Sequence, residues 1–153
     1  MDDTPALRRL RELGVAHTVV RHGPVGSVAE AAAGRGIEVR ALVKTIVVRR
    51  GADDYVFVLV PGDREFSWPK LRTLLGVSRL SMPDAAEAKQ ATGYERGTIT
   101  PFGASHPWPV FADSSILGRS ISMGGGAHGM GVNLRADDAI TALGATVADL
   151  VVP

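Results

Sequence analysis

Cysteine is absent from this sequence, which excludes a disulfide framework, a thiolate metal site and a cysteine nucleophile. Aromatic residues make up only 5% of the chain, too few for a platform on which successive bases stack. No apolar run is long enough to cross a bilayer, and the first thirty residues lack a basic segment followed by an apolar one. We therefore expect a soluble cytoplasmic protein.

Excess charge of one sign is also lacking, because 17 Lys and Arg stand against 16 Asp and Glu, a net charge of +1. This balance argues against a protein that neutralises many phosphates along a nucleic acid, although not against one that binds only its end. The 153 residues, 45% of them hydrophobic, are typical of a globular chain and predict a single domain over residues 1–153.

Capping residues and glycines predict five helices. They begin near Thr4, Ser27, Ser67, Ser81 and Ala136, and each ends at a glycine. Strands are expected at residues 15–20, 41–48, 55–60, 77–80, 109–113, 119–123 and 132–135, with the second and third paired as a hairpin. The sequence predicts more strands than a fold of regularly alternating strands and helices would contain, so we expect a mixed α/β (α+β) fold with an irregular sheet. Residues 93–109 are predicted to form a long ordered loop, a feature that is commonly functional.

One charged residue, Lys44, lies within the apolar strand at residues 41–48. Strand alternation places it on one face with Ile46 and Val48, and neither face has the polar residues of a solvated surface. Two interpretations remain open. The side chain extends past the strand edge into water, or it faces a cleft where an anion or a developing negative charge is bound.

Two glycine-bearing segments could also belong to a site. Gly124, Gly126 and Gly129 have the G-x-G-x-x-G spacing, but a strand is expected to follow them, which disfavours a dinucleotide site. The run is either a wide, flexible turn or a place where backbone N–H groups approach a ligand closely. Gly97 and Pro101 are either a simple turn or, if they face Lys44, a place for a water or an oxyanion.

The sequence does not indicate a metal site or a serine nucleophile. The four histidines lack metal-ligand spacing, and no serine lies in a G-x-S-x-G elbow. No metal or cofactor is therefore expected. A cation and two glycine-bearing loops suit a reaction in which an already reactive ester is held, polarised and given a water.

Because these motifs occur in a particular order along the chain, residues 22–150 resemble the YbaK-type aminoacyl-tRNA deacylases. That family is related to the editing domain of bacterial prolyl-tRNA synthetases. The resemblance rests on four segments: Val-Lys-Thr around Lys44, Pro-Gly-Asp-Arg at residues 61–64, the Gly97-x-x-x-Pro101 loop, and the glycine run from Gly124 to Gly129. It implies a barrel-like mixed sheet flanked by helices. It also implies hydrolysis of the ester that joins a wrong amino acid to the 3′-terminal adenosine of a tRNA, with help from the terminal ribose hydroxyl.

Site roles are carried over from the same resemblance. Lys44 is expected to position the substrate, and Gly97 and Pro101 to place the attacking water. Substrate-binding residues are expected to be Thr45, Asp113, Gly124, Gly125, Gly126 and His128. The acceptor end of an aminoacyl-tRNA is the expected partner, with a synthetase as a possible second one.

Departures from the family pattern leave the amino acid open. Gly124 stands where some members carry serine, Gly131 stands near an acidic position, and His128 replaces a basic residue. The first hypothesis is a free-standing trans-editing deacylase for tRNA-Pro carrying a small non-cognate amino acid. The alternatives are a non-catalytic module that binds a nucleotide or RNA end, and a deacylase of another small ester.

Overall fold

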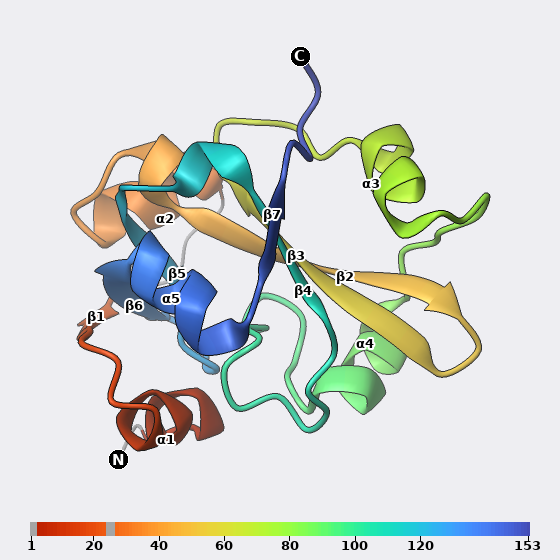
Figure 1. Ribbon diagram of the computed structural model, residues 1–153. Coiled ribbons are helices and arrows are strands. Elements are labelled where there is room, and N and C mark those ends of the chain that lie inside the picture. Colours follow the sequence, from red (N-terminus) through yellow and green to blue (C-terminus); the bar gives the residue numbers. More distant parts are fainter. Residues whose placement is uncertain (1–2, 24–26) are drawn as a thin grey trace.

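Two β-sheets, connected by an isolated bridge, form the centre of the molecule. The computed structural model describes residues 3–23 and 27–153 (Figure 1). One sheet has the order β1-β6-β5 and is antiparallel: β1 (Thr18–Arg21), β6 (Met130–Arg135) and β5 (Ser120–Gly124). The other has the order β2-β3-β4-β7 and is mixed: β2 (Val43–Gly51), β3 (Asp54–Pro61), β4 (Val110–Asp113) and β7 (Thr146–Ala148). A parallel bridge between Leu42 and Ser122 connects the two, and the mixed α+β class is confirmed.

The described residues contain five α-helices, as predicted. They are α1 (Pro5–Glu12), α2 (Val28–Gly34), α3 (Trp68–Leu75), α4 (Ala85–Thr92) and α5 (Ala136–Leu143), with 3-10 turns at η1 (Val39–Ala41) and η2 (Ser114–Ile116). The side chains of Thr4, Ser27 and Ser67 each accept a backbone N–H bond at a helix start, as expected of N-caps. The fourth helix begins later than predicted, because Asp84 rather than Ser81 is its cap.

Strand β2 is buried on both faces, which the absence of a solvated face predicted. Val43 and Val47 pack in one hydrophobic core with Phe57 of β3. Val48 packs in a second core with Leu71 of α3. The predicted hairpin with β3 is confirmed, and its register pairs Lys44 with Val60.

Two strand predictions need correction. The predicted strand at residues 77–80 is wrong: Gly76 adopts a left-handed φ of 68° after α3, and the irregular chain that follows makes only a bridge between Ser81 and Arg49. The first strand begins at Thr18 rather than residue 15, because the Val15 amide still bonds to the Leu10 carbonyl at the end of α1.

The loop over residues 93–109 has no helix or strand, as predicted, and buried hydrogen bonds order it. The Tyr94 hydroxyl donates to the Phe102 carbonyl at 2.7 Å, and the Trp108 indole N–H donates to the Ala91 carbonyl at 2.7 Å. Gly103 approaches α1 so closely that a Cβ there would lie 2.4 Å from the Pro5 carbonyl carbon. These contacts fix the path of the loop, and with it the position of Gly97.

Candidate functional site

A pocket of about 380 Å³ follows the open edge of β2. Residues 42–47 all line it. Successive strand residues point to opposite faces, so six in a row can line one pocket only along the edge of the strand. The opposite wall comes from Gly97 and Ile99 of the long loop and from Gly124 at the end of β5.

Backbone groups of β2 face this pocket. The Gly62 amide donates to the Leu42 carbonyl at 2.6 Å, so Leu42 and the residues two and four after it turn their backbone toward β3. Arg49, of the opposite parity, bonds outward to Ser81 through both its amide and its carbonyl. By the same alternation, the backbone groups of Thr45 and Val47 point toward the pocket, where they offer donors and acceptors to a ligand.

The charge in the pocket is positive. Arg35, Lys44 and Arg96 line it, and its described lining includes no Asp, Glu, His, Ser or Cys. The Lys44 ammonium donates to the Arg64 backbone carbonyl at 3.2 Å, in a partly exposed position, and forms no ion pair with the described residues. A carbonyl leaves the positive charge uncompensated, so Lys44 can still attract a substrate oxygen.

Arg35 is a cation that the sequence analysis missed. It follows α2, and its Nη1 donates to the Ser122 hydroxyl at 3.2 Å and to the Met123 carbonyl at 3.4 Å. Burial lowers the pKa of its guanidinium. In the sequence, Gly34-Arg35-Gly36 resembles an ordinary helix end, and no local pattern marks the arginine as part of a site.

The long loop closes the pocket against the end of β5. A Cβ at Gly124 would lie 3.1 Å from the Ile99 carbonyl oxygen, so the strand and the loop are already in close contact. Gly97 has a φ of +91°, which favours glycine, and the His128 ring lies 3.7 Å from where its Cβ would be. The His128 ring in turn faces Glu95, with 3.3 Å between Nε2 and Oε2.

Four of the predicted site residues therefore line one pocket: Lys44, Thr45, Gly97 and Gly124. Pro101 is buried in the same loop but does not line the pocket. Gly125 and Gly126 pack toward the N-terminal segment instead. The Gly125 carbonyl accepts a bond from the Thr4 hydroxyl at 2.7 Å, and a Cβ at Gly126 would lie 2.9 Å from the Tyr94 ring.

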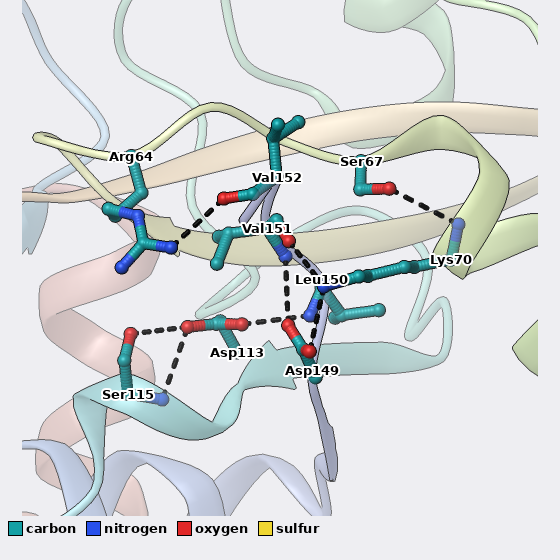
Figure 2. Close-up of polar contacts among 9 residues, drawn as sticks. All are labelled: Arg64, Ser67, Lys70, Asp113, Ser115, Asp149, Leu150, Val151 and Val152. Atoms are coloured by element: carbon teal, nitrogen blue, oxygen red, sulfur yellow. Dashed lines mark hydrogen bonds and ion pairs between the residues drawn. The ribbon is translucent and has the colours of Figure 1, made fainter.

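Asp113 lies outside the pocket, in a network that holds the C-terminal segment (Figure 2). Its buried carboxylate accepts from the Leu150 amide at 2.8 Å, from the Ser115 amide at 3.1 Å and from the Ser115 hydroxyl. These contacts give Asp113 a structural role, and its assignment as a substrate-binding residue stays a prediction.

Neither a metal centre nor a membrane span is found in the described part of the chain. Within residues 3–23 and 27–153, no three His, Asp or Glu side chains gather as metal ligands would. No helix among these residues is long and apolar enough to cross a bilayer.

Fold and pocket define the class: an α+β domain with a positively charged, partly apolar cleft whose described lining lacks a Ser, Cys or His nucleophile. The chain belongs to the aminoacyl-tRNA editing domain family, whose model matches residues 22–142. This is a family of aminoacyl-tRNA deacylases.

Named relatives agree with this assignment. The chain is 35% identical over 121 residues to a proline–tRNA ligase of Thermosipho melanesiensis, and the match covers 76% of this chain but about a fifth (21%) of the ligase. It is 30% identical to EbsC of Enterococcus faecalis, a candidate Cys-tRNA(Pro)/Cys-tRNA(Cys) deacylase, over 71% of this chain and 66% of that protein. A solved structure of a candidate trans-editing enzyme for prolyl-tRNA synthetase superposes with a TM-score of 0.88 at 27% identity, covering 99% of this chain and 100% of the other.

Proposed function

We propose that the protein is a trans-editing deacylase that hydrolyses the ester of a misacylated tRNA, with tRNA-Pro carrying a small non-cognate amino acid as its substrate. The observation that carries this proposal is the pocket on the β2 edge, which combines cations with a glycine-bearing loop and has no acidic residue in its described lining. Such a site binds and polarises an ester oxygen without forming a covalent intermediate. The reaction would take place in the cytoplasm, where tRNA is charged.

The proposed step is a direct hydrolysis. A water oxygen attacks the ester carbonyl carbon, and the carbonyl oxygen becomes an oxyanion. The bond from carbon to the ribose oxygen then breaks, and the proton lost by water passes to that oxygen, which yields the free amino acid and a free ribose hydroxyl. Lys44 stabilises the oxyanion or holds the substrate end, while the Gly97–Pro101 loop positions the water.

The pocket lining suits an apolar aminoacyl group. Much of the wall is aliphatic, from Val28, Leu42 and Ile99, and the volume is about 380 Å³. The connection to tRNA-Pro comes from the relatives, which include proline–tRNA ligases and the candidate trans-editing enzyme for prolyl-tRNA synthetase.

A second basic hollow supports binding of the RNA itself. Arg49, Arg50, Arg72 and Arg79 line a depression of about 510 Å³ at the far end of β2. Arg49 and Arg50 pair with Glu87 and Asp54, whereas Arg72 and Arg79 form no ion pair among the described residues. A local cluster of this kind suits the phosphates of an acceptor stem, and a net charge of +1 does not prevent it.

Lys44 provides the test. Purified wild type, Lys44→Ala and the control Lys89→Ala are incubated with a panel of mischarged tRNAs, and release of the amino acid is measured. Lys44→Ala should lower kcat by about 10²–10³ while the melting temperature stays near that of wild type, because its ammonium makes one partly exposed hydrogen bond. Lys89, paired on the surface with Glu95, should be dispensable.

Three outcomes would contradict the proposal. Wild-type protein that binds charged tRNA but releases no amino acid from any member of the panel would favour the non-catalytic module. Equal rates on intact charged tRNA and on an aminoacylated adenosine would favour a deacylase of small esters. Full activity of Lys44→Ala would remove the role assigned to Lys44.

A further inference from the structure

Arg35 carries a charge that the fold does not neutralise. Its side chain is half-buried, and no carboxylate in residues 3–23 and 27–153 forms an ion pair with it. Its described acceptors, the Ser122 hydroxyl and the Met123 carbonyl, are both uncharged, and its Nε is buried without any hydrogen-bond partner. Removing a charge from water is costly unless an opposite charge compensates for it. An anionic ligand at this position would supply that compensation.

The guanidinium of Arg35 fits in its observed position because residue 131 is a glycine. A Cβ on Gly131 would lie 2.7 Å from Nε, 2.8 Å from Cζ and 2.9 Å from Cδ of Arg35. Real Cβ contacts are not that short, so any side chain at 131 would force the guanidinium to move. The pair therefore acts as one unit, in which Gly131 provides the space and Arg35 fills it.

The guanidinium also lies at the boundary between two hollows. Arg35 and Gly97 line both the pocket on the β2 edge and a neighbouring depression of about 560 Å³ that includes His22 and His128. The end of a charged tRNA is long, with an acyl group on one side of the ester and a nucleoside on the other. If the two parts occupy the two hollows, the ester must pass beside Arg35 and Gly97.

We propose that Arg35 is a second cationic residue of the site that touches the substrate, where it binds an anionic oxygen at the ester end of the charged tRNA. This inference rests on the function proposed above. Two oxygens have the required chemistry: the ester carbonyl oxygen, which becomes negative when water attacks, and the phosphodiester that precedes the terminal adenosine. A planar guanidinium with several donors suits either.

A purely structural role makes the opposite prediction for stability. If Arg35 only ties α2 to β5, its replacement lowers the melting temperature. If its charge is kept for a ligand, Arg35→Met retains the packing of the side-chain stem, removes an uncompensated charge, and melts at the same temperature or higher. Arg40→Met is the matched control, because Arg40 is exposed on η1 and its ion pair among the described residues is with Glu38 on the surface.

Kinetics on two substrates identify the oxygen. If Arg35 stabilises the carbonyl oxyanion, Arg35→Met lowers kcat by about 10²–10³ on both mischarged tRNA and aminoacylated adenosine. If it binds the phosphodiester, the variant raises KM on the tRNA and leaves the phosphate-free adenosine ester unaffected. Unchanged kcat and KM on both substrates, or a loss of activity that only follows a fall in melting temperature, would overturn the proposal.

Gly131→Ala tests the same inference without removing the charge. Its methyl group should displace the guanidinium and reproduce the loss seen with Arg35→Met. In the Arg35→Met background, the alanine should cause no further loss of activity, since the guanidinium that it would displace is already absent. Losses that multiply in the double variant would show that Gly131 acts independently of Arg35.

The assay separates this inference from the proposed function. Wild-type turnover measures the function alone. If the wild type is inert, the dissociation constant of a non-hydrolysable, amide-linked aminoacyl oligonucleotide is compared for wild type and Arg35→Met. An inert protein forms no oxyanion, so the phosphodiester is then the oxygen in question. Binding weakened at least tenfold by Arg35→Met supports the contact with the phosphodiester, and equal binding refutes it.

Discussion

Replacing Asp113 with alanine should destabilise the protein without changing the chemistry of its pocket. The carboxylate is buried and accepts hydrogen bonds from the Leu150 and Ser115 amides and from the Ser115 hydroxyl. Two further backbone hydrogen bonds hold the segment that contains Leu150. The Ser67 amide donates to the Leu150 carbonyl at 2.8 Å, and the Val152 amide donates to the Glu65 carbonyl at 2.8 Å. Figure 2 labels Ser67, Leu150 and Val152. Asp113 thus connects β4 to the end of the chain.

The expected loss of stability follows from the hydrogen bonds that are removed and from the donors that are left without an acceptor. A hydrogen bond to a charged group contributes about 1.5–3 kcal/mol, and a buried donor left without a partner costs about 1–3 kcal/mol. The Leu150 amide becomes such a donor, while the Ser115 hydroxyl can turn elsewhere. We therefore expect Asp113→Ala to lower the free energy of unfolding by about 3–5 kcal/mol, which for a chain of this size lowers the melting temperature by roughly 10 °C.

Urea unfolding followed by circular dichroism measures the loss, and deacylation is assayed below the melting transition. Asp138→Ala, an exposed acidic residue on α5, is the control and should change the free energy of unfolding by no more than about 0.5 kcal/mol. The value of kcat/KM per folded molecule of Asp113→Ala should equal that of wild type. A variant as stable as wild type but with lowered kcat/KM would refute the structural assignment and support the prediction that Asp113 binds substrate.

Two further variants test how the long loop is held. Burial raises the pKa of Tyr94 to about 12, so its neutral phenol stabilises the fold below pH 10, and that contribution is lost as pH rises through 12. Tyr94→Phe, which leaves the Phe102 carbonyl without its donor, should cost about 1 kcal/mol at pH 8 and should unfold with less pH dependence between pH 10 and 12 in urea titrations; an unaltered alkaline profile would contradict this. Gly103→Ala places a methyl group 2.4 Å from the Pro5 backbone and should cost about 3 kcal/mol in thermal unfolding. Gly76→Ala, with a similar positive φ but nothing within 4 Å, should cost only about 1–2 kcal/mol, and equal losses would show that the contact with α1 does not matter.

Local signals in the sequence were sufficient for most of the fold. Caps at Thr4, Ser27 and Ser67 placed helix starts because a side-chain oxygen and the backbone N–H groups it accepts from are only a few residues apart. The apolar run around Lys44 predicted a strand buried on both faces. The strand predicted at residues 77–80 is wrong because this segment reaches β2 only at its end, where Ser81 forms a single bridge to Arg49. Strand formation depends on pairing that a short stretch does not itself encode.

The site was only partly predictable for the same reason. Lys44 stood out because a charge in an apolar strand is a local anomaly, and Gly97 because it precedes a proline in a glycine-rich loop. Arg35 has no such local mark. Its place depends on Gly131, which is 96 residues away and whose missing side chain becomes meaningful only after β6 is placed beside the end of α2. Gly125 and Gly126 were predicted to bind substrate because they belong to a conspicuous glycine run. In the structure they pack against Thr4 and Tyr94, which the run itself does not indicate.

An open strand edge explains why the cations and the pocket occur together. An edge strand presents backbone donors and acceptors that can pair with another chain, and proteins commonly protect such edges with charge or with a covering loop. Here Ser81 covers the edge at Arg49, and the loop around Gly97 lies opposite residues 42–47 without closing over them. Arg35, Lys44 and Arg96 border the part that stays open. The positive charge that discourages pairing with another strand also attracts an anion, so one arrangement both protects the edge and suits the proposed substrate, a charged tRNA.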